Sequence, residues 1–312
     1  MKKERWKQNR SFPRDWKVVN EKLVVRGEFL LDLDWVKSWD EELEEMNKGK
    51  RGHPYEFPES LIKFQAVLGQ WIDYRGLEGM TRKLVVYTNL PNYNDYSTIN
   101  RRVNQLEPEI ELPKVGRISA TCDGSGIKMN NASDYRQEKY GRKKQKKYIK
   151  VTITANPFTK DLLDCDVHIE GDGPSEPEIA VSHLEELIKE GFEIDKFWGD
   201  GSFDCKDLFN FLQRYGILSA IKIRENASNK SDGSMRRARE VKEYKEKGYE
   251  KWARDKHYGR RWTGTEGIIS SVKVKFGDKV RAKEEGNMCK EVKRRFWAYQ
   301  RMKTYADARV AA

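Results

Sequence analysis

The sequence predicts an α/β protein whose mixed five-stranded sheet is flanked by helices and follows an N-terminal helical domain. In the middle of the chain, two runs rich in β-branched residues favour adjacent antiparallel strands. Strands and amphipathic helices then alternate, which indicates that later strands join the same sheet. The first third shows only the apolar spacing of helices. We therefore expect a helical domain at residues 1–110 and a catalytic domain at residues 111–312.

The N-terminal domain shows helical patterns separated by proline-containing loops. We expect an irregular arm with one short helix around residues 31–47, followed by a helical block over residues 59–106. Ser97 is a candidate N-cap for the last helix of this block. Arg101 and Arg102 follow it, so the helix pair is interpreted either as a DNA-reading element or as ordinary helical packing, which is the commoner use of short helix pairs.

The predicted strands of the second domain occupy residues 117–122, 148–155, 162–170, 194–198 and 217–223. A turn beginning at Asn156 and Pro157 joins the second strand to the third, which predicts a hairpin. Helices expected at residues 179–188 and 205–215 connect the later strands. This order predicts a sheet that contains both antiparallel and parallel pairs.

Residues 225–262 interrupt the alternation with a stretch that is nearly all polar and richer in Lys and Arg than in acids. We interpret this stretch as a basic insertion, partly helical, on the surface. Arg236 and Arg237 would then be available to DNA phosphates, and a solvated charged linker is the alternative. Two helical stretches, at about residues 264–276 and 287–305, complete the predicted domain.

The whole chain is basic, with 61 Lys and Arg against 50 Asp and Glu and a net charge of +11. Such a surface favours a polyanionic partner, usually DNA or RNA, although a well-solvated surface is the plain alternative. No apolar run reaches the length of a membrane span, and no apolar segment follows the basic N-terminus as in a secretory signal. We therefore expect no membrane partner and a cytoplasmic, nucleoid-associated location.

Two aspartates, each followed by Gly-Ser, stand at the expected ends of two strands in TCDGSG and WGDGSFD. A single Asp-Gly after a strand usually marks a turn. Asp123 and Asp200, however, end strands of one sheet, where α/β proteins place functional groups. Glu266 belongs to a predicted helix that could pack on this sheet. Thr265 is a candidate N-cap for that helix, which would put Glu266 in its first turn.

Three converging carboxylates suit divalent metal ions, because hard cations bind oxygen ligands. Two such ions can stabilise the attacking and leaving oxygens of a phosphoryl displacement. The four cysteines and four histidines are scattered and include no CxxC pair, which disfavours a zinc knuckle, a disulfide framework or a Ser-His-Asp triad. The sequence therefore predicts a metal site made of carboxylates.

Six segments of the chain, taken in sequence order, resemble those of the DDE transposases of prokaryotic insertion sequences. The resemblance is to the Tyr-Arg-Glu-Lys group, whose catalytic domain is ribonuclease-H-like. The resemblance covers roughly residues 59–300. Its segments are SLIKFQAVLGQWIDYRGLEGMTRKL, YNDYSTINRR, ISATCDGSGIKM, WGDGSFD, AIKIREN and RRWTGTEGIISSVKVKFG. The resemblance implies a ribonuclease-H-like sheet and an enzyme that cleaves strands at transposon ends and transfers them into target DNA.

The same resemblance implies roles for individual residues. Asp123, Asp200 and Glu266 would be the catalytic residues and would hold two Mg²⁺ ions, for which Mn²⁺ can substitute. A homodimer would hold the transposon ends and the target DNA.

Three further residues match the Tyr-Arg-Glu-Lys pattern and would contact DNA phosphates, namely Tyr258, Arg261 and Lys273. Arg261 stands one residue further from Glu266 than the pattern has, and Arg260 is the rival if the loop is shifted.

Two other interpretations remain open from the sequence. A nuclease of the same fold would hydrolyse nucleic acid without joining strands, and a strand-transfer assay with a pre-cut 3′-OH end distinguishes it. A catalytically silent, DNA-binding descendant is disfavoured because all three acids are present, and metal titration distinguishes it. If Glu266 points away from the two aspartates, Glu225 and Glu284 are the next acids to test.

Overall fold

The computed structural model of the chain describes residues 15–129, 148–228, 230 and 232–311. At its centre lies a sheet of five strands: β1 (Arg117–Lys128), β2 (Tyr148–Ala155), β3 (Leu162–Ile169), β4 (Glu193–Gly199) and β5 (Leu218–Ile221). The strand order is β3-β2-β1-β4-β5, with antiparallel pairs among β1, β2 and β3 and parallel pairs joining β1, β4 and β5. The structure thus confirms the predicted mixed sheet.

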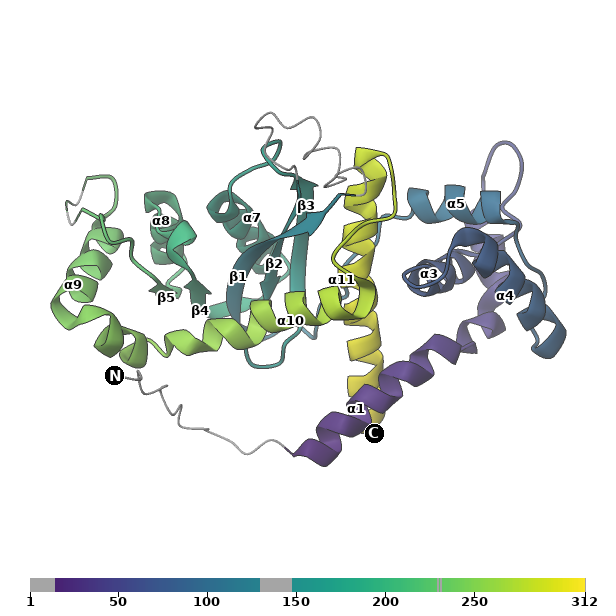
Figure 1. Cartoon of the computed structure of the whole chain (residues 1–312), viewed down its shortest axis with the longest axis horizontal. Helices are drawn as coiled ribbons and strands as arrows, with labels where there is room; N and C mark the ends of the chain where they lie inside the picture. The colour runs from purple at the N-terminus through teal and green to yellow at the C-terminus, as the bar shows by residue number, and fades with distance from the viewer. Residues whose placement is uncertain (1–14, 130–147, 229, 231, 312) are drawn as a thin grey trace, which may run out of the picture.

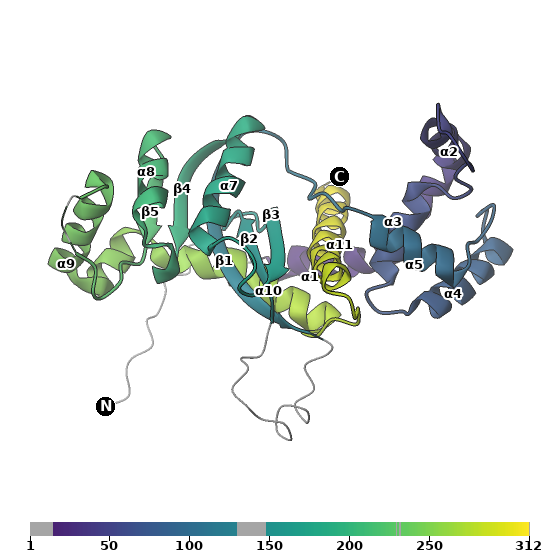
Figure 2. The same cartoon turned by 90° about the horizontal axis from the view of Figure 1, so that it is seen from above.

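Helices cover both faces of the sheet, so that two apolar cores lie on opposite sides of it (Figures 1 and 2). On one face, α10 (Arg261–Phe276) and α11 (Glu285–Ala311) pack on β2 residues such as Val151 and Ile153. On the other face, α7 (Glu176–Lys189) and α8 (Lys206–Arg214) pack on β1 residues such as Ala120 and Cys122. In β2, the apolar residues Ile149, Val151 and Ile153 face one core, and buried Thr152 and Thr154 alternate with them toward the other face.

Strand β1 is longer than predicted, and the expectation that Asp123 ends it is wrong. Residues Thr121 to Lys128 all pair with β2, which keeps the chain extended through the Asp-Gly-Ser-Gly segment. The parallel pairing with β4 goes only as far as Thr121, opposite Trp198. Asp123 therefore lies on the free edge of β1 just past the end of β4, the strand that Asp200 follows.

Helix α10 begins earlier than predicted, at Arg261 after a short 3₁₀ turn, η4 (Tyr258–Arg260). Thr265 is therefore not its N-cap; it is fully buried, and its hydroxyl points back to the carbonyl of Arg261. Glu266 consequently lies in the second turn. Arg261 was expected in a loop because its neighbours are polar, and tertiary contacts rather than helix propensity place it in the helix.

Gly264 brings α10 against β1. A Cβ at this position would lie 2.5 Å from the Thr121 methyl carbon and 3.2 Å from the backbone of Pro157. These distances are shorter than side chains tolerate, so only glycine allows the helix to lie directly on the strand. The approach matters for the site because Glu266 is on the same helix, half a turn further on.

The N-terminal region is helical, as predicted, with α2 (Trp39–Asn47), α3 (Glu59–Leu68), α4 (Tyr74–Tyr87) and α5 (Tyr96–Gln105). Asp95 rather than Ser97 caps α5, because the Asp95 carboxylate accepts the first free backbone N–H groups. The expected irregular arm contains a helix, α1 (Trp16–Glu28), which packs on α11 (Figure 1). Apolar side chains on its exposed face obscured the helical stripe.

Helix α11 joins the sheet domain to the N-terminal helices through two buried arginines. Arg295 donates to the carbonyls of Gly277 and Lys279 at 2.9 and 2.7 Å and pairs with Glu291 at 2.6 Å. Arg294 donates to the Val103 carbonyl at the end of α5. Together they hold the C-terminal end of α10 and the end of α5 to one helix.

Among the described helices, α11 included, each is too short or too polar to cross a lipid bilayer.

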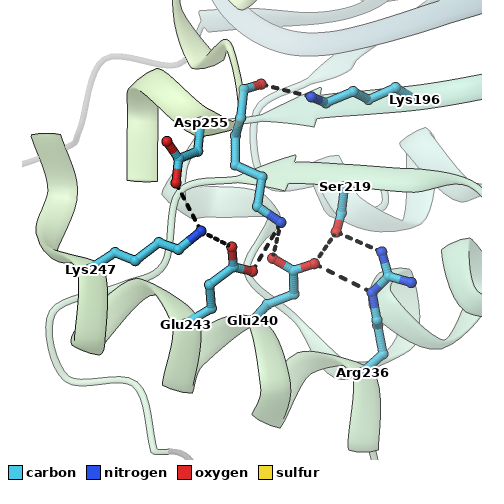
Figure 3. A network of polar contacts seen from close by, with 8 residues as sticks. Lys196, Ser219, Arg236, Glu240, Glu243, Lys247 and Asp255 are labelled. Atoms are coloured by element: carbon cyan, nitrogen blue, oxygen red, sulfur yellow. Dashed lines mark hydrogen bonds and ion pairs between the residues drawn. The ribbon is translucent and has the colours of Figure 1, made fainter. Parts of the chain in front are cut away.

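The predicted basic insertion forms a helix, α9 (Met235–Asp255), which is kinked at Gly248, packs against α8 and η4 and contacts Ser219 of the edge strand β5. Its side chains Val241 and Trp252 are fully buried. Figure 3 shows that several of its charged side chains form a network of ion pairs. The network comprises the ion pairs Arg236–Glu240, Lys256–Glu240, Lys256–Glu243, Lys247–Glu243 and Lys247–Asp255, with Ser219 also donating to Glu240. The segment is therefore part of the folded domain and not a solvated linker.

Two glycines of α10 predict opposite effects of the same substitution. Gly264→Ala should lower the free energy of unfolding by about 1–3 kcal/mol, because the added methyl group overlaps Thr121. Gly267→Ala should raise it by up to about 1 kcal/mol, because that position is exposed and alanine favours a helix. Urea unfolding of both variants measures the difference. Equal effects of the two substitutions would contradict the close approach of α10 to β1.

Candidate active site

An open pocket of about 660 Å³ lies where β1 extends past the end of β4. It is lined by Asp123, Gly124, Ser125, Asp200, Arg261, Glu266, Ile269, Ser270, Lys273, Val274 and Asp278. The three predicted acids, which are far apart in sequence, thus come together on one side of the sheet. Glu266 lines this pocket, whereas Glu225 and Glu284, the acids considered in its place, are not among its lining residues.

Arg261 lies between two of these acids. Its Nη1 is 3.2 Å from Oδ2 of Asp123, and its Nη2 is 3.3 Å from Oε1 of Glu266. The Arg261 and Asp123 side chains are 10% and 14% exposed, so their pairing is shielded from water, whereas Glu266 is 43% exposed. Among the described residues, Nε of Arg261 is buried with no hydrogen-bond partner. The guanidinium therefore supplies the positive charge that lets these carboxylates approach each other.

Asp200 is held by the turn that follows β4. Its Oδ1 accepts the backbone N–H of Ser202 at 2.7 Å and the Ser202 hydroxyl at 2.5 Å, in the short 3₁₀ turn η3 (Gly201–Phe203). The Asp-Gly-Ser sequence after a strand is therefore a turn, and the turn also fixes the direction of the Asp200 side chain. From the sequence, a simple turn and a turn that places a site carboxylate could not be distinguished, and in the structure this segment is both.

The negative charge at this site is only partly balanced. Burial raises the pKa of Asp123 to about 6, and the nearby charges of Asp200 and Glu266 act in the same direction, while Arg261 opposes them. A carboxylate that is buried beside other carboxylates resists ionisation unless a cation stands close to it. The site thus favours an additional cation beside these acids.

The side chains fit a divalent metal ion by their chemistry, because carboxylate oxygens are the ligands that such ions prefer. The arrangement is not that of a metal-loaded site: within the described ranges, no three His, Cys, Asp or Glu side chains are close enough to share one ion. Arg261 contacts the same oxygens that a metal ion would use. Guanidinium and metal would therefore compete for Asp123 and Glu266.

Of the other predicted residues, Lys273 and Tyr258 lie at this site. Lys273 lines the pocket and donates from Nζ to the Ser125 hydroxyl and the Gly126 carbonyl at 2.8 and 2.9 Å. Tyr258 is 4% exposed and packs against Trp252, with the Arg261 guanidinium 5.8 Å from its ring centre. The Tyr258 ring thus lies beside the Arg261 side chain, and because the ring is buried it is not accessible to a ligand.

The remaining predicted DNA contacts lie outside the pocket lining. Arg101 is exposed on α5, whereas Arg102 is half-buried and lies over the Tyr55 ring. Arg237 pairs with Asp204, whose side chain is fully buried, through two contacts of 2.6 and 3.1 Å. Together with the Arg236–Glu240 pair, this corrects the expectation that Arg236 and Arg237 are available to phosphates, because both are engaged within the fold.

Glu176 is a residue of the site that the sequence reasoning missed. Its Oε2 accepts the Ser202 hydroxyl at 2.7 Å, and its Oε1 is 3.0 Å from Lys150. A Cβ on Gly124 would lie 2.3 Å from the Glu176 carboxylate, which shows how closely this side chain covers β1. The Ser-x-x-Glu capping box that begins α7 pairs Ser175 with Glu178, so it gave no signal for Glu176, which only the fold brings to Ser202.

Two family models, both described as a transposase DDE domain, match the chain at residues 120–300 and 24–132. No curated protein matches it. The solved structures that resemble it include the piggyBac transposase synaptic complex with hairpin DNA, with 12% identity, a TM-score of 0.36, and coverage of 93% of this chain and 79% of the other. The Drosophila P element transposase strand transfer complex has 13% identity, a TM-score of 0.28, and 60% coverage of this chain, which spans 42% of that transposase. Family membership rests on the two domain models and not on these distant structures.

Burial of Asp123 predicts a pH-dependent stability of the metal-free protein. Its pKa is about 6 in the folded chain against an ordinary value of 3.8 for an aspartate in water, so the folded state keeps the proton to higher pH. The contribution of Asp123 to stability should therefore fall as pH rises from about 4 to about 6. Asp123→Asn mimics the protonated side chain. At pH 7 the free energy of unfolding of this variant should exceed that of the unsubstituted chain by about 1–3 kcal/mol. At pH 4 the two free energies should be equal. Urea unfolding in EDTA at several pH values measures this, and a difference independent of pH would contradict it.

Proposed function

Because the chain belongs to the DDE transposase family, we propose that Asp123, Asp200 and Glu266 are the catalytic carboxylates of a DNA transposase. The observation that carries the proposal is their common pocket, since the three acids come from β1, the turn after β4, and α10. Acids from three separate elements that meet at one end of a sheet are typical of a site and not of a surface. The enzyme would cleave DNA strands at transposon ends and join them to target DNA.

The cofactor of this family is a divalent metal ion, and for this chain we assign it as Mg²⁺, with two ions and with Mn²⁺ able to substitute. Asp123, Asp200 and Glu266 provide the oxygen ligands. When bound, such ions activate a water or a 3′-OH group for attack on a phosphodiester and offset the charge that develops there. The unbalanced carboxylate charge around Asp123 supports this assignment.

The basic residues of the pocket would act on the DNA backbone. Lys273 lies at the pocket wall with its ammonium group on the β1 backbone, within reach of a phosphate that enters. Arg261 would leave Asp123 and Glu266 when metal binds and would then contact a phosphate, which positions the strand without reading its sequence. Tyr258 would keep the Arg261 side chain at this level through its ring.

The N-terminal helices would bind the transposon end. Arg101 is exposed on α5, and other arginines of this region lie over tyrosine rings, as in the Arg75–Tyr96 and Arg82–Tyr93 pairs. Interleaved cations and aromatic rings suit a nucleic acid surface. Because two ends must be held together for transposition, we propose a homodimer in the DNA complex, which would act on chromosomal DNA in the nucleoid.

Substitution of the two aspartates tests the catalytic assignment. Asp123→Asn and Asp200→Asn should lower Mg²⁺-dependent cleavage of end DNA by roughly a thousandfold or more, because the metal ligands are lost. End binding in a gel-shift assay should change little. Asp195→Asn is the matched control, since Asp195 is on β4 but pairs with Arg117 at the surface.

Normal cleavage by either aspartate variant would refute the assignment. A pre-cut end with a free 3′-OH should give a joined product with target DNA, whereas a nuclease of the same fold would give none.

The Arg261 bridge predicts opposite effects on metal binding and on cleavage. Arg261→Gln removes the cation that competes for Asp123 and Glu266, so Mn²⁺ should bind roughly three- to tenfold more tightly in the absence of DNA. Cleavage should nevertheless fall, because the proposed phosphate contact is lost. Mn²⁺ titration by electron paramagnetic resonance measures the first effect. Arg260→Gln is the control, as Arg260 lies over Phe158. Weaker Mn²⁺ binding by Arg261→Gln would contradict competition.

A further inference from the structure

Glu176 reaches the candidate site from the face of the sheet opposite to α10. Successive strand residues point to opposite faces, so Gly124 faces α7 when Asp123 faces Arg261. Glu176 covers Gly124 and contacts Ser202, which in turn contacts Asp200. A continuous line of polar contacts therefore connects Lys150 at the side of the sheet with one of the proposed metal ligands.

The Ser202 hydroxyl stands between two carboxylates. Its oxygen is 2.7 Å from Oε2 of Glu176 and 2.5 Å from Oδ1 of Asp200. A hydroxyl has one proton, so it can donate to only one of these acceptors at a time. When the hydroxyl donates to Glu176, Asp200 keeps the backbone N–H of Ser202, and Lys150 balances the charge of Glu176 at 3.0 Å. Asp200 has no such partner among the described residues, which leaves it to attract a cation from the pocket.

The same contacts determine how Asp200 is turned. Its Oδ1 is occupied by the hydroxyl and the backbone N–H of Ser202. In the part of the chain that the structure describes, no hydrogen bond to Oδ2 is found, and Asp200 lines the pocket. Glu176 itself does not line the pocket, and the N-cap of α7 is already formed by Ser175 with Glu178. The Glu176 carboxylate is thus not required to start its helix.

We propose that Glu176 is a positioning residue: by accepting the Ser202 hydroxyl it fixes the turn whose backbone N–H binds Oδ1 of Asp200, which leaves Oδ2 for the metal site. The inference rests on the proposed function, in which Asp200 binds a divalent cation. Residues that orient a metal ligand commonly change metal affinity by roughly 10- to 100-fold when they are replaced. Glu176 would therefore influence metal binding without contacting metal or DNA.

Mn²⁺ titration of the full-length, DNA-free chain tests this proposal. Glu176→Ala and Ser202→Ala should each weaken Mn²⁺ binding by roughly tenfold. The double variant should bind no more weakly than either single one, because both substitutions break the same link. Ser202→Thr keeps the hydroxyl and should retain the affinity. Glu186→Ala, on the exposed face of α7 beside Lys189, is the matched control and should bind Mn²⁺ normally.

The outcomes separate this inference from the proposed function. If Asp200→Asn leaves Mn²⁺ binding unchanged, the proposed metal site itself is wrong. If Asp200→Asn abolishes binding while Glu176→Ala and Ser202→Ala do not weaken it, only the positioning role is overturned. Losses that multiply in the double variant would also overturn it, since they would show two independent effects. Thermal unfolding shows whether each variant is folded. If the Glu176 variant does not fold, Mn²⁺ binding by the Ser202→Ala variant decides the test.

Discussion

The contact on which the site depends is the guanidinium of Arg261 between Asp123 and Glu266. Two carboxylates from different elements repel each other when they are partly buried, and a cation between them offsets that repulsion. A buried arginine with partners of this kind costs solvation, so its presence indicates a demand for positive charge at this point. The proposed metal ions answer the same demand. Arginine and metal are thus alternative solutions to one electrostatic problem.

Placement of the acids depends on packing that is remote from them. Gly264 allows α10 to lie on β1, and Arg295 fastens the C-terminal end of α10 to α11. Because α10 is held at both of these points, the position of Glu266 relative to Asp123 is fixed. Asp200 is set separately, by a turn of its own, with Ser202. The site is therefore assembled from one rigid helix, one strand and one turn, and each has its own structural support.

The succession of strands along the chain and the two aspartates as candidate site residues could be predicted from the sequence, because β-branched runs and Asp-Gly-Ser turns are local signals. Signals that depend on tertiary contacts could not. The extension of β1 past Asp123 follows from pairing with β2, and the early start of α10 follows from the burial of Arg261. The charges of α9 suggested a DNA surface, yet Arg237 pairs with a buried acid. Glu176 was hidden for the same reason, since only the fold brings it to Ser202.

A crystal structure of the full chain with Mn²⁺, located by its anomalous scattering, tests the central claim most directly. The account predicts manganese in the pocket, bound by oxygens of Asp123, Asp200 and Glu266 at roughly 2.0–2.3 Å, a distance usual for a divalent cation with carboxylate ligands. It also predicts that Arg261 no longer bridges Asp123 and Glu266. Manganese bound elsewhere, or bound with the Arg261 bridge intact, would contradict the claim that these three acids form one metal site.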